Sequence, residues 1–253
     1  MIYQGDCLEI MPTIPDKSID MILCDLPYGT TACKWDTIIP FEPLWKQYKR
    51  LIKDNGAIVL TASQPFTSAL VMSNVKNFRH QWVWVKNKPT GAFCAPYMPM
   101  KASEDVLVFG YAKVKYFPVM VKRTPEEFKD CYRMNDSKSW GSNITNTRDN
   151  ILKRKVKEEQ WFKYPTNVLN IKKDDNRNGT QHPTQKPVAL FEYLIRTYTN
   201  EGDTVLDNCA GSGTTGIACL NTGRNYILIE KEIKYYELMK ERLDRETRQV
   251  AMW

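Results

Sequence analysis

Histidine and paired cysteine are scarce in this sequence. Its 253 residues include only two histidines, and the seven cysteines form no Cys-x-x-Cys pair. Zinc sites need clustered Cys and His ligands, and disulfide frameworks use an even set of cysteines, so the sequence predicts neither a metal site nor a disulfide-stabilised fold. Several cysteines stand within apolar runs, where a thiol packs as a small hydrophobic side chain.

Long apolar runs are also lacking. No stretch of about eighteen apolar residues occurs, and the first residues lack the basic and apolar regions of a signal peptide. No Gly-Lys-Ser/Thr follows any glycine-rich segment, which excludes a P-loop. A hydrophobic content of 42% is enough for one substantial core with a modest inserted lobe. We therefore expect an enzyme-sized globular protein without membrane association, located in the cytoplasm.

Positive charge is concentrated in one part of the chain. The whole sequence has 36 Lys and Arg against 29 Asp and Glu, a net charge of +7. Residues 113–165 alone contain 13 Lys or Arg against 7 Asp or Glu, and they also contain eight aromatic residues. Cations mixed with stacking surfaces are typical of nucleic-acid binders. A basic lobe that is simply solvated is the alternative.

Short apolar runs alternate with helical patterns over most of the chain. The expected strands are Met1–Tyr3, Met21–Cys24, Ala57–Thr61, Gln81–Val85, Asp105–Phe109, Thr204–Leu206 and Tyr226–Ile229. The expected helices are Phe41–Ile52, Pro65–Val75, Pro187–Tyr198, Thr214–Leu220 and Ile233–Arg248. This alternation predicts a doubly wound α/β fold with a mostly parallel sheet. It is lost between Gly110 and Asn170, which predicts an insertion over 113–165.

Asp25, Leu26, Pro27 and Tyr28 directly follow one of the apolar strand patterns. Ligands bind at strand ends in doubly wound sheets. The carboxylate of Asp25 and the carbonyl of Leu26, stiffened by Pro27, provide two acceptors for one amino group. Hydrogen bonds from both protons of a base amine localise its lone pair on nitrogen, and Tyr28 offers a stacking face for an extruded base. An ordinary Asp-x-Pro turn is the alternative.

A glycine-rich segment, 207–216, follows a predicted strand and opens a helix. Gly211 and Gly213 allow the backbone to approach a ligand, and Glu230 ends the next strand, where a carboxylate accepts ribose hydroxyls. These features predict a nucleoside cofactor. The segment also matches the Gly-x-Gly-x-x-Gly of nicotinamide enzymes, which leaves an oxidoreductase as an alternative. Against it, 231–253 is too short for the second mononucleotide half in its usual place.

Three separated motifs follow one another along the chain: Asp25 to Tyr28, His182 to Pro187, and Asp207 to Thr215. In that order they resemble the β-class amino methyltransferases of DNA, over nearly the whole chain. The resemblance implies a class I methyltransferase sheet with one reversed strand near its edge. It implies S-adenosylmethionine as methyl donor and double-stranded DNA as substrate. Residues 1–112 would be the catalytic half, 113–165 the target-recognition insertion, and 166–253 the cofactor-binding half.

The resemblance also assigns roles to single residues. The Asp25 carboxylate and Leu26 carbonyl would hold the target amine, although the family more often has proline at the position of Leu26. Asp6 would meet the cofactor adenine and Glu230 its ribose. The full set of expected cofactor-binding residues is Asp6, Cys7, Thr184, Gln185, Lys186, Asp207, Cys209, Ala210, Gly211, Ser212, Gly213, Thr214 and Glu230. The expected DNA contacts, chosen for their charge, are Lys86, Lys88, Lys122, Arg123, Lys153, Arg154, Lys155 and Lys157.

The first residue of the predicted catalytic motif indicates which base is methylated. An Asp at this position, here Asp25, resembles the adenine enzymes, whereas Ser is commoner in enzymes that act on cytosine N4. We therefore expect methylation of adenine N6, with cytosine N4 as the alternative. A DNA-binding protein without turnover also remains open. A homodimer and a cognate restriction endonuclease are candidate partners under the same resemblance.

The basic cluster Lys153, Arg154, Lys155 and Lys157 gives a first test of DNA binding. Replacing all four residues with neutral ones should reduce the slope of log affinity against log salt by about 0.9 for each phosphate that the protein no longer neutralises. Titration of duplex DNA at several salt concentrations measures this slope. An unchanged slope would mean that the cluster faces solvent.

Overall fold

The computed structural model describes residues 1–253 apart from 31–32, 34–35, 128–160, 174–184 and 251–253. The chain forms two compact units, one made of Met1–Phe117 with Asn167–Trp253 and the other of Pro118–Thr166. The smaller unit falls within the stretch where the α/β alternation of the sequence is lost. Among the described residues, no helix is long and apolar enough to span a bilayer.

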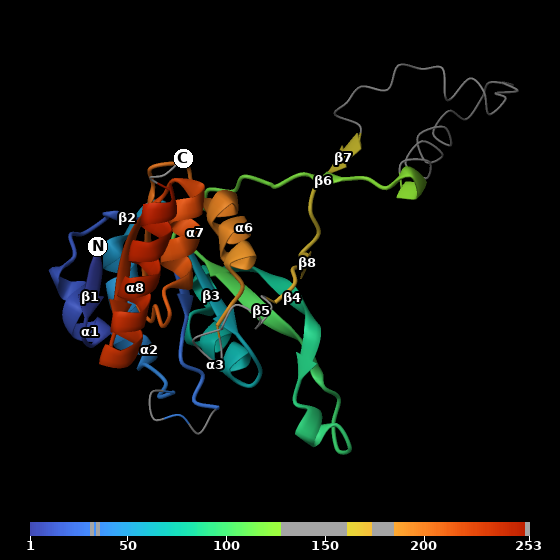
Figure 1. The fold of residues 1–253 in the computed structure, drawn as a ribbon, viewed down its shortest axis with the longest axis horizontal. Coiled ribbons are helices and arrows are strands. Elements are labelled where there is room, and N and C mark those ends of the chain that lie inside the picture. Colours follow the sequence, from blue (N-terminus) through green and yellow to red (C-terminus); the bar gives the residue numbers. More distant parts are fainter. Residues whose placement is uncertain (31–32, 34–35, 128–160, 174–184, 251–253) are drawn as a thin grey trace, which may run out of the picture. The chain divides into compact units, whose positions relative to one another are not determined.

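An eight-stranded sheet is the centre of the larger unit (Figure 1). In spatial order its strands are β1 (Ile2–Gln4), β10 (Asn225–Glu230), β9 (Thr204–Asp207), β2 (Ile19–Asp25), β3 (Ile52–Ala62), β5 (Lys101–Phe109), β4 (Phe78–Thr90) and β8 (Val168–Asn170). β5 is antiparallel to both of its neighbours, and all other pairs are parallel. The predicted doubly wound, mostly parallel sheet with one reversed strand is therefore confirmed.

Helices cover both faces of this sheet. One face carries α1 (Cys7–Ile10), α2 (Phe41–Leu51) and α3 (Phe66–Ser73), and the other carries α6 (Val188–Tyr198), α7 (Thr214–Thr222) and α8 (Ile233–Val250). Successive side chains of a strand point to opposite faces, so Ile22 and Cys24 pack in the first core whereas Met21 and Leu23 pack in the second. Burial on both faces explains why β2 is a continuous apolar run.

The predicted strands and helices are all present, with ends that differ by a few residues. β8 was not predicted, because three residues are too short for a pattern and lie where the alternation is lost. It pairs in parallel with β4, with Leu169 opposite Trp84. In the smaller unit, β6 (Val121–Lys122) and β7 (Phe162–Lys163) form an antiparallel pair.

The strand that ends at Glu230 lies beside the strand that leads to Asp6. β1 pairs in parallel with β10, with Gln4 opposite Glu230, and α8 contacts both strands. The amino group of Met1 donates to the carbonyl of Tyr226 at 2.8 Å, where β10 begins. α8 therefore has the position of a crossover helix from β10 to β1, although β1 comes first in the sequence.

This arrangement predicts that the chain tolerates circular permutation. Joining Trp253 to Met1 through a short Gly/Ser linker, and reopening the chain at 175–178 outside the described residues, should give a folded protein. The linker adds only modest closure entropy because that cost grows slowly with length. Binding of S-adenosylmethionine by the permutant, measured by calorimetry, checks the result. Failure to bind over several linker lengths would contradict the crossover role of α8.

Candidate active site

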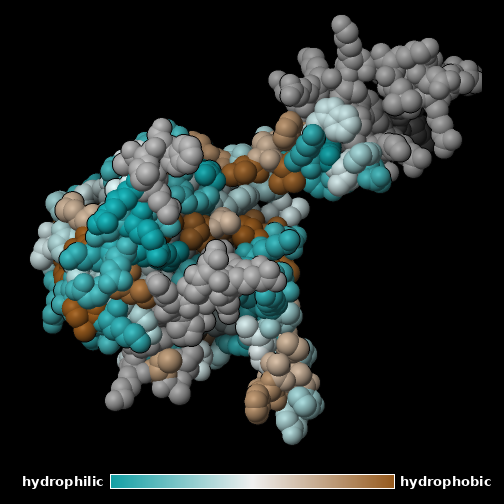
Figure 2. Space-filling model, in the orientation of Figure 1, coloured by the Kyte–Doolittle hydropathy of each residue, from teal (hydrophilic) through white to brown (hydrophobic). Residues whose placement is uncertain are grey.

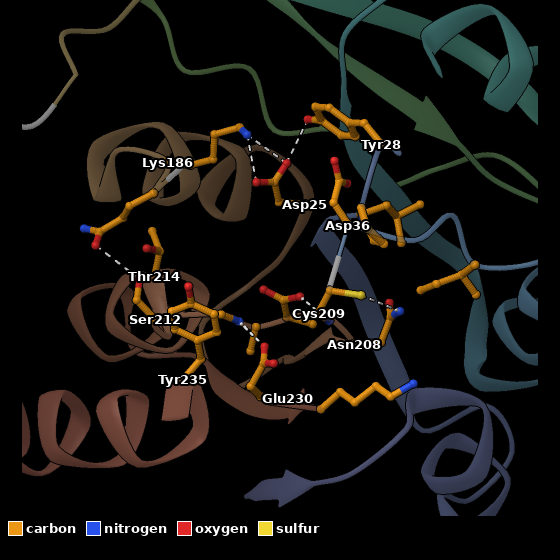
Figure 3. A pocket seen from close by; sticks show the side chains of 18 of the residues that line it. Asp25, Tyr28, Asp36, Lys186, Asn208, Cys209, Ser212, Thr214, Glu230 and Tyr235 are labelled. Atoms are coloured by element: carbon orange, nitrogen blue, oxygen red, sulfur yellow. Dashed lines mark hydrogen bonds and ion pairs between the residues drawn. The ribbon is translucent and has the colours of Figure 1, made fainter. Parts of the chain in front are cut away.

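A cavity of about 700 Å³ opens where β1, β2, β9 and β10 end (Figure 3). Parallel strands end at one edge of a sheet, so segments that are far apart in the sequence meet there. The predicted site residues that line it are Asp6, Cys7, Asp25, Leu26, Pro27, Tyr28, Lys86, Gln185, Lys186, Asp207, Cys209, Ala210, Gly211, Ser212, Thr214 and Glu230. Predicted acceptor and cofactor residues thus share one space.

Asp25 is the last residue of β2, and its carboxylate is surrounded by donors. Oδ1 accepts hydrogen bonds from the hydroxyl of Tyr28 at 2.8 Å and from the hydroxyl of Thr61 on β3. The ammonium of Lys186 donates to Oδ1 at 2.8 Å and to Oδ2 at 2.7 Å. These bonds hold the carboxylate in one orientation, facing the cavity. Thr61 had no marker in the sequence, because its role depends on its register opposite Asp25.

The ring of Tyr28 is held from the side of α3. It stacks on Phe66 with ring centroids 5.1 Å apart and an interplanar angle of 25°. Burial raises the pKa of the Tyr28 hydroxyl well above its usual value, so the group stays protonated and can donate to Asp25. The ammonium of Lys186 lies 5.5 Å from the ring centroid. The ring is therefore fixed beside Asp25 at the wall of the cavity.

Asp36 holds the loop that follows the predicted catalytic motif, Asp25 to Tyr28. Its two carboxylate oxygens accept hydrogen bonds from the backbone N–H groups of Gly29 and Thr30, both at 2.9 Å. Gly29 has a φ of +66°, which favours glycine, and it allows the chain to turn back toward Asp36. Asp36 was not predicted, because no sequence pattern marks an acid that accepts hydrogen bonds from backbone groups six and seven residues earlier in the chain.

The glycines of the cofactor segment have different tasks. A Cβ at Gly211 would meet no atom within 4 Å, and the residue has a φ of +52° and lines the cavity. A Cβ at Gly213 would lie 2.7 Å from Met239 of α8, and one at Gly216 would lie 2.7 Å from Leu228 of β10. Gly211 therefore leaves space for a ligand, whereas the other two make close packing possible. Gly213, predicted to bind cofactor, does not line the cavity.

Glu230 and Asp6 form the wall at the ends of β10 and β1. The buried carboxylate of Glu230 accepts the N–H of Gly211 at 2.7 Å and the N–H of Glu232 at 2.8 Å, one bond on each oxygen. Burial raises its pKa, and these two bonds oppose the rise. Asp6 accepts the N–H of Leu8 and pairs with Lys231 at 3.0 Å. Each acid keeps lone pairs that can accept hydroxyl or amino protons from a ligand.

Asp207 holds the glycine segment in place through hydrogen bonds to its side chain. Its carboxylate accepts the N–H of Cys209 at 3.0 Å and the hydroxyl of Thr215. Burial raises the pKa of Asp207 to about 6. Gln185 joins this segment from another part of the chain, because its side-chain oxygen accepts the hydroxyl of Ser212 at 3.1 Å. The glycine segment is thus held on both sides.

The structure corrects the expectation for Lys86. An exposed lysine was predicted to contact DNA, but Lys86 is buried and pairs with Glu104 at 3.1 Å, so it is not available to a phosphate. Lys88 and Lys122 are exposed and Arg123 is partly buried. Four of the other expected DNA contacts, Lys153, Arg154, Lys155 and Lys157, and the expected cofactor residue Thr184 lie outside the described residues. In the part of the chain that is described, no cluster of side chains could hold a metal ion.

Comparisons with known proteins point to one family. A family model of the N6/N4 class, described as DNA methylase, matches residues 19–241. The DNA adenine methyltransferase YhdJ of Escherichia coli is 28% identical over 96% of this chain and 82% of its own length. The type II methyltransferase M2.MboI of Moraxella bovis is 28% identical over 95% of this chain and 86% of its own.

A solved structure has the same fold. The crystal structure of the M1.HpyAVI–SAM complex superposes with a TM-score of 0.62 at 28% identity, covering 96% of this chain and 98% of its own. The family model spans the acceptor motif at Asp25, the glycine segment and Glu230, and it favours methyl transfer over the oxidoreductase that the glycine pattern left open. The chain belongs to the N6/N4 family of DNA methylases.

Proposed function

We propose that this protein transfers a methyl group from S-adenosylmethionine to the N6 amino group of adenine in double-stranded DNA. The observation that carries the proposal is the position of Asp25. Its carboxylate stands at the end of β2 in the cavity that Gly211 and Glu230 also line. A methyl acceptor held by Asp25 and a methyl donor held by Gly211 and Glu230 would therefore meet in one space.

The described residues fit S-adenosylmethionine, which supplies an electrophilic methyl group when bound. The open space at Gly211 accommodates the methionine part of a ligand that passes close to the backbone. Each carboxylate oxygen of Glu230 can accept a further hydrogen bond from a ribose hydroxyl of the cofactor. Asp6 can accept a hydrogen bond from the amino group of the cofactor's own adenine. The groups that would contact the ligand are carboxylate oxygens and backbone, which are the groups that nucleoside recognition uses.

The chain mainly has to align two reactants and exclude water. Asp25 and the Leu26 carbonyl accept the two protons of the target amine, which localises the nitrogen lone pair and directs it toward the donor. Tyr28 supports the ring of the extruded base. No general base is obligatory, because the amine can lose a proton after it has been methylated.

Adenine is favoured over cytosine by two observations. Asp25 stands first in the catalytic motif, and a relative of this chain is named a DNA adenine methyltransferase. Nucleoside analysis of methylated DNA decides between N6-methyladenine and N4-methylcytosine. Relatives that are named type II methyltransferases support a companion restriction endonuclease as a proposed partner. A homodimer is proposed on the resemblance to the β-class enzymes alone. The cytoplasm, where bacterial DNA is found, remains the expected location.

Part of the DNA interface, we propose, is the tip of the hairpin formed by β4 and β5. Phe93 is fully exposed and Tyr97 is 88% exposed at this tip, which is largely apolar in Figure 2. No acid occurs between Asn87 and Ser103, whereas Lys88 and Lys101 flank the tip. The hairpin arms line the cavity, so the tip lies on the part of the chain that meets DNA beside an extruded base.

The hairpin tip gives a test of DNA contact. Phe93→Ala and Tyr97→Ala should each lower DNA affinity by about tenfold, because an aromatic side chain stacked on a base contributes about 1–3 kcal/mol. Val75→Ala is the matched control, since Val75 is 54% exposed and precedes the opposite end of β4. Affinities are measured by fluorescence anisotropy of labelled duplex DNA. Equal affinities for all three variants would remove the tip from the interface.

Asp25→Ala tests the catalytic motif. Methylation should fall by orders of magnitude, because an interaction made in the transition state is deleted. Transfer of tritium from labelled S-adenosylmethionine into duplex DNA measures the rate. Cofactor affinity should change little, because Glu230, Gly211 and Asp6 are untouched, and calorimetry provides this control. Near-normal turnover by the folded variant would remove Asp25 from the mechanism.

A further inference from the structure

A chain of four charged side chains runs behind the acceptor site. Lys186 pairs with Asp25 at 2.7 Å and with Oε2 of Glu104 at 3.3 Å, and Oε1 of Glu104 pairs with Lys86 at 3.1 Å. The side chains of Lys186 and Lys86 are 8% and 3% exposed, and that of Glu104 is 18% exposed. Glu104 comes from β5 and has no place in any motif of the sequence.

Lys186 occupies the place that a target amine needs. Its ammonium donates to both oxygens of Asp25 and lies 5.5 Å from the centroid of the Tyr28 ring. A base stacked against Tyr28, with its amine bonded to Asp25, would put a nitrogen in the same position. Oδ1 of Asp25 already accepts the hydroxyls of Tyr28 and Thr61, so Oδ2, whose donor is Lys186, is the oxygen to which the amine would bind. The amine and the ammonium therefore compete.

Glu104 offers Lys186 a second partner. Its Oε2 atom is fully buried and accepts no hydrogen bond, although the ammonium lies 3.3 Å away. A buried carboxylate oxygen without a donor is costly, so a small movement of Lys186 from Asp25 toward Glu104 exchanges one charge-assisted hydrogen bond for another. No proton and no net charge has to leave the site in this exchange.

We infer that Lys186 is a placeholder for the target amine and that Glu104 is the positioning residue that receives it. Before a base enters, Lys186 holds Asp25 in orientation. When the amine binds Asp25, Lys186 transfers to Glu104. This inference rests on the proposed function, because it needs an amine as the incoming group.

The protonation of Lys186 suits both positions. Burial alone would lower the pKa of its ammonium, but the charges of Asp25 and Glu104 outweigh burial and raise that pKa well above its usual value. Lys186 therefore remains a cation whether it bonds to one carboxylate or the other. Lys86 keeps the remaining oxygen of Glu104 in place, so Glu104 points toward the acceptor site throughout.

Three variants test the exchange: Glu104→Gln, Lys186→Met and the two combined. Glu104→Gln should lower the methylation rate by about tenfold to a hundredfold, the range of a charge-assisted hydrogen bond, because Lys186 then stays on Asp25. The double variant should be at least about tenfold faster than Glu104→Gln, because no ammonium remains to be displaced. A residue that only maintains the fold would not give this rescue. Glu192→Gln is the matched control, since Glu192 pairs with Arg196 on α6 away from the cavity.

Base capture is measured separately from turnover. Modified-base sequencing of DNA methylated by the wild-type protein first identifies the target adenine, and 2-aminopurine then replaces the base next to it, so that the target keeps its N6 amino group. The fluorescence of 2-aminopurine should rise on binding of the wild-type protein and of the double variant, and rise less with Glu104→Gln. Affinity for S-adenosylmethionine, measured by calorimetry, should be the same in all variants.

The outcomes separate the two proposals. If the wild-type protein methylates no base in DNA, the proposed function is refuted, and the exchange with it. N4-methylcytosine in place of N6-methyladenine would refute the choice of adenine alone, because cytosine also presents an amine. Two outcomes overturn the exchange alone when the wild-type protein methylates normally. In the first, Glu104→Gln is as fast as the wild-type protein. In the second, the double variant is no faster than Glu104→Gln. A large drop in cofactor affinity in Lys186→Met would identify Lys186 as a cofactor ligand and would also overturn it.

Discussion

The parallel pairing of β2 with β9 is the contact on which the site depends. Met21 lies opposite Val205 and Ile22 opposite Leu206, all of them fully buried. Because the two strands run in the same direction, the acceptor motif after β2 and the glycine segment after β9 leave the sheet at one edge. A slip of one residue would exchange the two faces of β2 and turn Asp25 away from the cavity, so packing on both faces fixes the register.

The same logic makes the order of the motifs along the chain unimportant for the chemistry. The wall that we propose for the nucleoside combines Asp6 after the first strand with Glu230 after the last, and β1 pairs directly with β10. Both acids are held by backbone N–H groups of their own turns, so each arrives in place once its strand is docked. The cavity is thus a product of strand adjacency, and it forms only when the two ends of the chain share a sheet.

The sequence predicted what local patterns encode. Apolar runs marked the strands, and a motif at a strand end marked Asp25 and Gly211. Thr61 was missed because the fold, not the local sequence, brings it near Asp25. Asp36 was missed because no local pattern marks the hydrogen bonds that it accepts from Gly29 and Thr30. Lys86 was read as an exposed cation, because its partner Glu104 lies on the neighbouring antiparallel strand, which a one-dimensional pattern cannot pair with it.

Two buried lysines and the two partly buried acids that pair with them are a cost that packing alone does not explain. Replacing a buried ion pair with apolar side chains of similar size is often neutral or stabilising, so Asp25, Lys186, Glu104 and Lys86 are not the arrangement that stability would select. An acceptor site, however, needs an ionised carboxylate in a place that water does not fill. A carboxylate with few donors in such a place would be free to turn, and a rigidly paired one could not bind a new donor. A lysine shared between two acids meets both requirements, because it holds Asp25 in orientation while it can still be displaced.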